Sequence, residues 1–341
     1  MCSDPGQDMI IKDIKEHRLN RVVVAACSPR MHEITFRKAL ENAGLNPYMF
    51  EMANIREHDS WVHTNRSEAT IKARDLIAGA VSRVKWHESL EKRSVPVNPA
   101  TLVIGGGISG ISAALELANS GKQVFLIERK ANLGGTVSLI DITSPFLNSA
   151  SQMIDYKIKE AMNHPNIEVF LNAEVDRVSG YVGNFETSVQ VNRHNTTLNF
   201  GNVIVATGLK PFDAKKLENY AYGKLPDILT SLEFEQVLKD GIILTRDGRE
   251  PKNVAIIHCV GSRNEDYNPY CSRTCCMVAL KFVNQLKSAL PEANIFDIYS
   301  DMRSFGKGCE ELYSETSKKN VMFLTFDHKS SLPEVRKAAH N

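Results

Sequence analysis

The segment TLVIGGGISG, residues 101–110, decides the fold of the central part of this chain. Its first four residues are apolar or β-branched, as is typical of a strand in the interior of a sheet. The turn that follows carries the G-x-G-x-x-G pattern at Gly105, Gly107 and Gly110. A glycine pattern of this kind is specific only when a strand precedes it and a helix follows it.

The sequence after the turn supplies that context. We expect a helix from about Ile108 to Asn119, which Gly121 ends, and then a second strand over residues 123–127. That strand ends on the acidic residue Glu128, at roughly the 20-residue spacing of dinucleotide-binding units. The order of strand, turn, helix, strand and acid predicts a Rossmann-like βαβ unit in an α/β protein.

Each part of this unit has a physical role in binding a dinucleotide. Gly105 permits the tight turn, Gly107 lets backbone N–H groups approach a pyrophosphate, and Gly110 allows the helix to pack closely on the strand. The helix N-terminus favours the phosphate, and the Glu128 carboxylate can accept hydrogen bonds from a ribose diol. The same carboxylate would repel a 2′-phosphate, which disfavours NADP. The alternative is a glycine-rich turn in a Rossmann-like domain that binds no nucleotide.

Two further glycine motifs favour FAD over NAD at this site. The sequences LGG at residues 133–135 and ATG at residues 206–208 resemble signatures of flavoproteins with two dinucleotide-binding domains. Each is a common turn on its own, but the combination with the first motif indicates FAD. We predict no catalytic side chain. The predicted cofactor-binding residues are Gly105, Gly107, Ile108, Ser109, Gly110, Glu128, Arg129, Gly134, Gly135, Ala206, Thr207 and Gly208.

A second α/β unit is expected in the C-terminal part of the chain. Its predicted elements are a strand over residues 254–257, a helix over 276–290, and strands over 295–299 and 321–326. In a flavin disulfide reductase, the first of these strands would lead into another glycine-rich loop that holds NAD(P)H. Here it leads into HCVGSR, residues 258–263, which contains a single glycine. The second unit is therefore predicted to be a poor nicotinamide site.

Four of the seven cysteines crowd into this second unit, at Cys259, Cys271, Cys275 and Cys276. In a reducing compartment such crowding indicates metal or redox chemistry, and four thiolates suit a 4Fe-4S cluster or a structural zinc ion. The spacing matches neither a bacterial ferredoxin motif nor a paired C-x2-C zinc ribbon. The alternative is that these cysteines are small buried side chains with, at most, one redox pair. We interpret the adjacent His258 as a packed or hydrogen-bonded residue rather than a ligand.

The composition describes a folded chain with no general affinity for nucleic acid or membranes. It has 341 residues, 43% of them hydrophobic, and a formal net charge of +1. No basic patch indicates nucleic-acid binding, and no apolar run approaches the roughly 18 residues of a membrane span. The N-terminal sequence MCSDPG lacks the apolar stretch of a secretory signal. We therefore expect a cytoplasmic protein.

Several phrases occur in an order that is specific for one protein family. They are ACSPRMHE at 26–33, FEMANIRE at 50–57, the glycine motif at 105–110, HCVGSR at 258–263, YCSRTCC at 270–276 and DMRSFGKG at 301–308. Together they resemble the A subunit of heterodisulfide reductase. The quinone-interacting oxidoreductase subunits of sulfate reducers look similar. The resemblance extends to about Phe326.

The resemblance implies a flavin and iron-sulfur protein, an FAD-dependent oxidoreductase with a thioredoxin-reductase-like core. In that family, FAD receives electron pairs from a partner such as a hydrogenase or formate dehydrogenase module. The electrons are divided through iron-sulfur clusters, as in electron bifurcation, between ferredoxin and the coenzyme M–coenzyme B heterodisulfide of methanogenesis. By position, Cys259, Cys271, Cys275 and Cys276 resemble the ligands of the family's 4Fe-4S cluster beside the flavin. We expect a hetero-oligomer with other heterodisulfide reductase subunits.

The resemblance also sets the expected domain organisation. No C-x2-C-x2-C motif is present, so we expect a truncated member of the family without ferredoxin modules. The expected segments are a small N-terminal α/β domain (1–95), an incomplete FAD-binding domain of thioredoxin-reductase type (96–250), a second Rossmann-like unit with the cysteine group (251–326) and a tail (327–341).

The N-terminal domain has three predicted elements. They are a strand over residues 21–26, a helix over 33–42 that Gly44 ends, and a long amphipathic helix through 73–84. A proline-containing linker, residues 94–99, is expected to follow.

Two other functions remain open at this stage. One is a flavin-dependent disulfide reductase whose dithiol is Cys271 with Cys275, or Cys275 with Cys276. The other is a non-catalytic assembly fragment that binds partner subunits without holding FAD.

Overall fold

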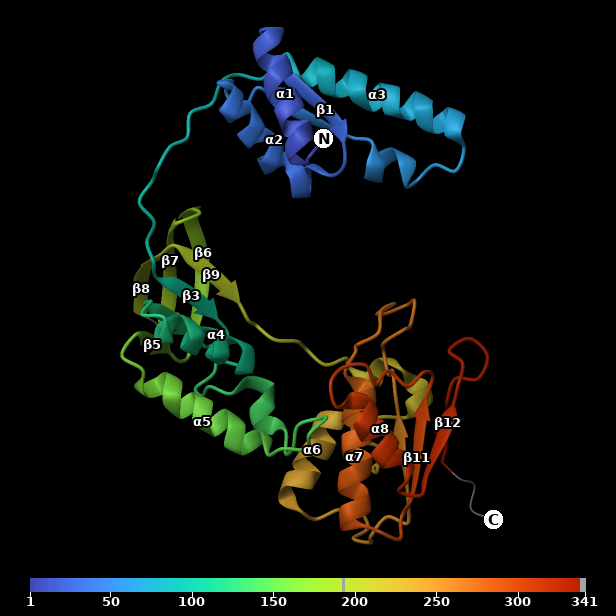
Figure 1. The fold of residues 1–341 in the computed structure, drawn as a ribbon. Coiled ribbons are helices and arrows are strands. Elements are labelled where there is room, and N and C mark those ends of the chain that lie inside the picture. Colours follow the sequence, from blue (N-terminus) through green and yellow to red (C-terminus); the bar gives the residue numbers. More distant parts are fainter. Residues whose placement is uncertain (192–193, 338–341) are drawn as a thin grey trace. The chain divides into compact units, whose positions relative to one another are not determined.

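A computed structural model describes residues 1–191 and 194–337 of the chain. The chain forms two compact units, Met1–Val95 and Pro96–Asn341 (Figure 1). The finer division of the second unit into residues 96–250, 251–326 and 327–341 stays a prediction.

The N-terminal unit is a small α/β structure. Two parallel strands pair from Val22 with Phe50 to Ala26 with Asn54. Its elements are α1 (Asp4–Glu16), β1 (Val22–Ala26), α2 (Pro29–Ala43), β2 (Phe50–Asn54), the π-helical turn η1 (Arg56–Ser60) and α3 (Arg66–Val84). Its core comprises Ile10, Ile14, Val24, Phe36, Leu40, Phe50 and Met52.

The predicted elements of this unit are confirmed, but both helices begin earlier than expected, the long one at Arg66. The helix expected over residues 33–42 begins earlier, because Pro29 occupies its first turn, where a missing N–H costs nothing. It ends at Gly44 as predicted, where φ is +84°. Helix α1 was not predicted from the sequence.

A four-stranded parallel sheet forms the first half of the second unit. Its strands lie in the order β5-β4-β3-β9, as in a Rossmann-like sheet. The glycine-rich turn follows the inner strand β3. Its elements are β3 (Thr101–Ile104), α4 (Ile108–Asn119), β4 (Val124–Ile127), η2 (Gly135–Leu139), α5 (Ala150–Asn163), β5 (Ile167–Phe170) and β9 (Asn202–Val205). The predicted βαβ unit is confirmed almost to the residue.

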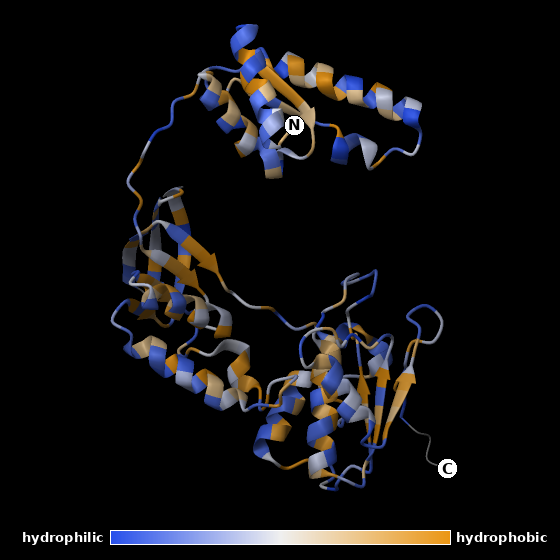
Figure 2. Ribbon diagram, viewed as in Figure 1, coloured by the Kyte–Doolittle hydropathy of each residue, from blue (hydrophilic) through white to orange (hydrophobic). Residues whose placement is uncertain are grey.

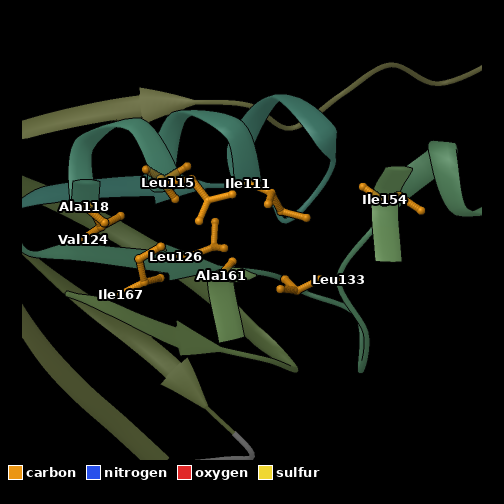
Figure 3. Close-up of a cluster of buried hydrophobic side chains, with 11 residues drawn as sticks. Ile111, Leu115, Ala118, Val124, Leu126, Leu133, Ile154, Ala161 and Ile167 are labelled. Atoms are coloured by element: carbon orange, nitrogen blue, oxygen red, sulfur yellow. The ribbon is translucent and has the colours of Figure 1, made fainter. Parts of the chain in front are cut away.

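The apolar faces of α4 and β4 form the core of this sheet layer. Ile111 and Leu115 of α4 pack with Val124 and Leu126 of β4 (Figure 3). All four side chains are at most 4% exposed. This packing holds the first turn of α4 at the carboxyl end of β3.

A three-stranded antiparallel sheet is inserted between β5 and β9. It is formed by β6 (Ala173–Tyr181), β7 (Asn184–Val191) and β8 (His194–Phe200). Its apolar side chains share a core with the other face of the parallel sheet: Ala100, Leu102, Ile127, Ala173, Val189, Leu198 and Phe200. Within this sheet, only residues 187–191 show an alternating pattern that predicts a strand from the sequence.

The C-terminal part is a second Rossmann-like unit, as predicted. A parallel sheet in the order β10-β11-β12 packs against α7. Its elements are η3 (Ala214–Lys216), η4 (Glu218–Tyr220), α6 (Ser231–Asp240), β10 (Asn253–Ile257), α7 (Cys275–Ala289), β11 (Asn294–Tyr299), α8 (Cys309–Ser317) and β12 (Val321–Thr325). The strands of the two parallel sheets in the second unit are largely hydrophobic, whereas the helices alternate hydrophobic and hydrophilic residues (Figure 2). The predicted α/β fold class is therefore confirmed.

Among the described residues, no helix combines the length and the apolar character that crossing a membrane would require.

Candidate functional site

The glycine-rich turn after β3 is shaped by the chain's own backbone at two positions. Gly105 has φ of +113°, and a Cβ there would lie 2.2 Å from the carbonyl oxygen of Ala206. A Cβ on Gly110 would lie 1.8 Å from the carbonyl oxygen of Gly105. Any larger residue would therefore separate α4 from the sheet, so the fold itself requires these two glycines.

Gly107 is different, because no such contact demands a glycine there. Its φ is −82°, and a Cβ at this position would have the Cα of Gly135 as its nearest neighbour, at 3.9 Å. Gly107 lies at the N-terminus of α4, followed by Ile108, which packs on the core, and by Ser109. Open space at a helix N-terminus is what a bound pyrophosphate requires.

The acid at the end of β4 is tied to the same turn. Glu128 is buried, with 8% of its surface exposed. Its Oε2 accepts a hydrogen bond of 2.8 Å from the Gly106 N–H, and its Oε1 accepts a hydrogen bond of 2.8 Å from the Lys130 N–H. Each oxygen retains a lone pair, so the carboxylate can still accept from ribose hydroxyls. The neighbouring Arg129 side chain is exposed.

The other two glycine motifs meet this turn. The Gly134 N–H donates to the carbonyl of Gly106 at 2.8 Å, and a Cβ on Gly135 would lie 2.9 Å from the Gly107 Cα. Ala206 follows β9, and its N–H donates to the carbonyl of Ile104 at 2.8 Å. The predicted residues Thr207 and Gly208 come next and are exposed. Three segments far apart in sequence thus converge at one edge of the sheet.

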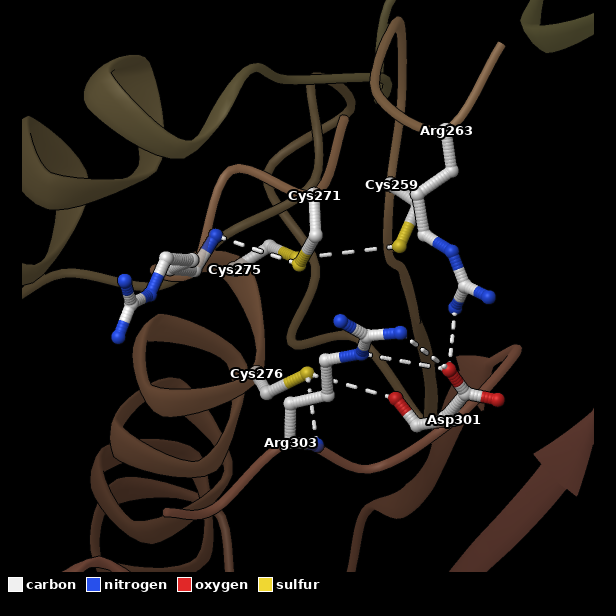
Figure 4. Close-up of polar contacts among 8 residues, drawn as sticks. Cys259, Arg263, Cys271, Cys275, Cys276, Asp301 and Arg303 are labelled. Carbon is white, nitrogen blue, oxygen red and sulfur yellow. Dashed lines mark hydrogen bonds and ion pairs between the residues drawn. The ribbon is translucent and has the colours of Figure 1, made fainter. Parts of the chain in front are cut away.

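The four clustered cysteines, named the thiol centre below, lie at the carboxyl end of β10 and the start of α7 (Figure 4). The Sγ atoms of Cys259 and Cys275 are 3.9 Å apart. Cys271 lies in the preceding loop, so it and Cys275 are not on one helical turn, and its Sγ accepts the Arg273 N–H at 3.3 Å. Cys276 is buried, and its Sγ accepts the Arg303 N–H at 3.4 Å.

Three of these thiols control one another's ionisation. Hydrogen bonds from the thiols of Cys259 and Cys276 hold the pKa of Cys275 well below its ordinary value, against the effect of burial. The pKa values of Cys259 and Cys276 are raised, because the Cys275 sulfur holds their protons and because burial disfavours their charged forms. Without metal, Cys275 is therefore the most acidic of these three thiols.

Two arginine side chains lie near the thiol centre (Figure 4). Asp301 binds Arg263 at 2.6 Å and Arg303 at 3.2 Å. Burial opposes the ionisation of Asp301, but the two guanidinium groups lower its pKa overall. Two positive charges against one negative charge favour anionic sulfur ligands at this position.

His258 and Asp297 form a buried pair that the sequence only half revealed. His258 Nε2 lies 2.6 Å from Asp297 Oδ1, and the two side chains are 1% and 0% exposed. A ring nitrogen of His258 also lies within 4.8 Å of the Sγ atoms of Cys275 and Cys276, a group that could hold a metal ion. The interpretation of His258 as hydrogen-bonded is confirmed. Asp297 was missed, although an acid inside the apolar strand predicted over residues 295–299 was an available signal.

Comparison with known proteins agrees with this geometry. Residues 99–257 match the family model described as pyridine nucleotide-disulphide oxidoreductase. The iron-sulfur A subunit (form 1) of the CoB–CoM heterodisulfide reductase of Methanopyrus kandleri is 37% identical over 95% of this chain and 62% of its own length. The chain is a homologue of the heterodisulfide reductase A subunit. It spans about three-fifths of the length of the curated relatives that it matches.

Two further relatives of heterodisulfide reductase type show similar sequence identity and coverage. The A subunit of the H2:CoB-CoM heterodisulfide,ferredoxin reductase of Methanothermobacter marburgensis is 37% identical over 93% of this chain and 61% of that protein. The A subunit of the H2/formate:CoB-CoM heterodisulfide,ferredoxin reductase of Methanococcus maripaludis is 36% identical over 92% of this chain and 60% of that protein.

Among solved structures, T. acidophilum thioredoxin reductase aligns with a TM-score of 0.42 and 19% identity, over 67% of this chain and 64% of that chain. L-proline dehydrogenase from P. horikoshii aligns with a TM-score of 0.35 and 20% identity, over 65% of this chain and 39% of that chain.

Proposed function

We propose that this homologue of the heterodisulfide reductase A subunit is a cytoplasmic electron-transfer protein that holds FAD at the glycine-rich turn and a 4Fe-4S cluster on the thiol centre. The observation that carries the proposal is the approach of Cys259, at the end of β10, to Cys275, at the start of α7. In a flavin disulfide reductase this strand-to-helix connection would hold a nicotinamide nucleotide. Here it gathers sulfur ligands instead.

The residues at the turn suit FAD. The open space over Gly107 admits a pyrophosphate, the α4 N-terminus favours its negative charge, and Glu128 is already held where ribose hydroxyls would lie. The proposed cofactor-binding residues are the same as those predicted from the sequence: Gly105, Gly107, Ile108, Ser109, Gly110, Glu128, Arg129, Gly134, Gly135, Ala206, Thr207 and Gly208.

The residues of the thiol centre suit an iron-sulfur cluster. Cys259, Cys271, Cys275 and Cys276 would supply four sulfur ligands, the usual number for a 4Fe-4S cluster. Main-chain N–H groups of Arg273 and Arg303 donate to two of these sulfurs and would disperse their negative charge. When bound, the flavin and the cluster would supply the exchange of an electron pair for single electrons.

The proposed partners are other heterodisulfide reductase subunits and an electron-donating hydrogenase or formate dehydrogenase module. The names of two relatives support this, since they specify hydrogen and formate as donors for those proteins. In such a hetero-oligomer, the electrons would go on to a heterodisulfide or to ferredoxin.

Metal and flavin content test the proposal. The chain is purified without oxygen, reconstituted with iron, sulfide and FAD, and analysed for iron, zinc and flavin. We expect about four irons and one flavin per chain. Cys276→Ser should lose the iron and keep the flavin, whereas Cys309→Ser, a matched free cysteine outside the centre, should keep both. Zinc in place of iron, or wild-type protein without flavin, would contradict the proposal.

A second candidate function is flavin-dependent disulfide reduction. The short distance between two cysteine sulfur atoms favours it. The Sγ atoms of Cys259 and Cys275 are 3.9 Å apart, so these two residues, rather than the pairs expected from the sequence, would form the dithiol. Two electrons from a nicotinamide nucleotide would reduce their disulfide. NAD(P)H-driven turnover of a disulfide substrate by iron-free protein, lost in Cys259→Ser, would support this function; no turnover would exclude it.

A further inference from the structure

A buried imidazole–carboxylate pair lies beside the thiol centre. His258 precedes the ligand Cys259 in the chain, and Asp297 approaches from the neighbouring strand β11. Their 2.6 Å contact joins Nε2 to Oδ1, and both side chains are almost completely shielded from solvent. The pair therefore presents one fixed orientation of the imidazole ring to its surroundings.

His258 and Asp297 each have one further polar atom that forms no hydrogen bond within the described residues. Among the residues that the structure describes, His258 Nδ1 and Asp297 Oδ2 are buried and have no hydrogen-bond partner. His258 as a whole is 2% exposed, so bulk solvent does not supply the missing contact. A buried polar atom without a hydrogen bond is costly, and its presence points to a group that completes it.

Two sulfur atoms of the thiol centre lie near this pair, although Nδ1 forms no direct hydrogen bond to them in the metal-free chain. Because Nε2 is bound to Asp297, Nδ1 is the nitrogen left for the Sγ atoms of Cys275 and Cys276, which lie within 4.8 Å of the ring. Thiolates and sulfide accept hydrogen bonds, so Nδ1 must carry a proton to bind them.

We propose that His258, anchored by Asp297, donates a hydrogen bond from Nδ1 to a cluster-ligand sulfur, that of Cys275 or Cys276, and thereby raises the reduction potential of the cluster. The inference rests on the proposed function, because it requires an iron-sulfur cluster on the thiol centre. A cluster gains negative charge on reduction, so a hydrogen bond to its sulfur stabilises the reduced form more than the oxidised form. Asp297 is the positioning residue, since it fixes the ring orientation.

Potentiometry of three substitutions in the full chain tests this role. His258→Leu removes the donor, His258→Gln keeps an N–H donor of similar reach, and Asp297→Asn keeps an acceptor oxygen but removes the anchoring charge. The control is Tyr299→Phe, which removes a hydroxyl from a ring centred 6.1 Å from that of His258. Midpoint potentials are measured without oxygen by dye-mediated titration, followed by electron paramagnetic resonance, together with iron content.

We expect His258→Leu to keep its iron and to shift the midpoint to more negative potential. Asp297→Asn should shift it less in the same direction, and His258→Gln and Tyr299→Phe should stay near the wild-type value. An unchanged potential in His258→Leu overturns the proposal. Loss of iron from a folded His258→Leu also overturns it, because His258 would then be a ligand. If His258→Leu does not fold, an unchanged potential in Asp297→Asn overturns the proposal.

Iron content separates this inference from the proposed function. Wild-type protein that binds no iron after reconstitution would contradict both. Iron-loaded wild type and iron-loaded His258→Leu with the same midpoint potential would overturn the inference alone.

Discussion

The Gly106 N–H donates a hydrogen bond of 2.8 Å to Oε2 of Glu128, so the turn after β3 and the acid after β4 are joined through a side chain. The bond crosses between two adjacent parallel strands at their carboxyl ends. It fixes the carboxylate next to the backbone that would face a pyrophosphate. Pre-organisation of this kind lowers the ordering cost of binding a nucleotide.

Substitution of Glu128 should weaken flavin binding more than it weakens the fold. Glu128→Gln replaces one accepting oxygen by a donor and removes the charge that favours ribose hydroxyls. A hydrogen bond to a charged group contributes about 1.5–3 kcal/mol, so we expect a loss of FAD affinity of about 10- to 100-fold. Titration of the apoprotein with FAD, followed by flavin fluorescence, measures it. The control is Glu116→Gln on the exposed side of α4, and equal affinities in both variants would contradict the assignment.

Alanine substitution at two glycines of the same motif should have different effects, one on flavin binding and the other on folding. Gly107→Ala places a Cβ no closer than 3.9 Å to other parts of the chain, so it should fold normally but lose FAD. Gly110→Ala places a Cβ 1.8 Å from the Gly105 carbonyl, so it should lower the melting temperature or prevent folding. Calorimetry and flavin content distinguish the two effects. Gly79→Ala, in open space on α3, should leave both unchanged or raise stability slightly. Full flavin binding by Gly107→Ala would refute the pyrophosphate position.

Alkylation of the metal-free protein should begin at Cys275 among the three coupled thiols. The lowered pKa of Cys275 means that its thiolate persists as pH falls towards neutrality, whereas the raised pKa values keep Cys259 and Cys276 protonated. At neutral pH, iodoacetamide should therefore modify Cys275 before the other two. Peptide mass spectrometry over a time course gives the order. Earlier modification of Cys259 would be inconsistent with the hydrogen bonding described above.

A buried ion pair joins α6, α7 and the loop after η2. Lys281 and Glu235 are each 3% exposed and bonded to each other; Lys281 Nζ also donates to the Ile142 carbonyl at 3.1 Å. Lys281→Met leaves the Glu235 charge buried and unpaired, so we expect a loss of about 3–5 kcal/mol in the free energy of unfolding.

Urea denaturation measures this loss. The double variant Lys281→Met with Glu235→Leu should recover most of it, because no charge then remains buried. Lys318→Met breaks an exposed pair with Glu315 and should cost far less, because solvent screens that pair. A Lys281→Met effect no larger than that control would show that water reaches the pair.

The predicted elements match the structure best where the sequence pattern is local and periodic. The strands at residues 101–104 and 253–257 and the helix at 108–119 combine a regular apolar pattern with glycine signals at their ends. The pattern is weak in the antiparallel sheet β6–β8, because its many exposed positions carry little hydrophobic contrast. Helix α1 was missed for a similar reason, since only Ile10 and Ile14 of its residues are buried.

The amino-acid order was sufficient to predict the βαβ unit, the FAD motif and a group of four cysteines, because each depends on residues that are near one another in the chain. Long-range packing determined which of these side chains become neighbours. It made Cys259, rather than Cys271, the close neighbour of Cys275, and it brought Asp297 on one strand to His258 at the end of another. Those contacts depend on how parallel strands align, and no spacing between residues along the chain encodes that alignment.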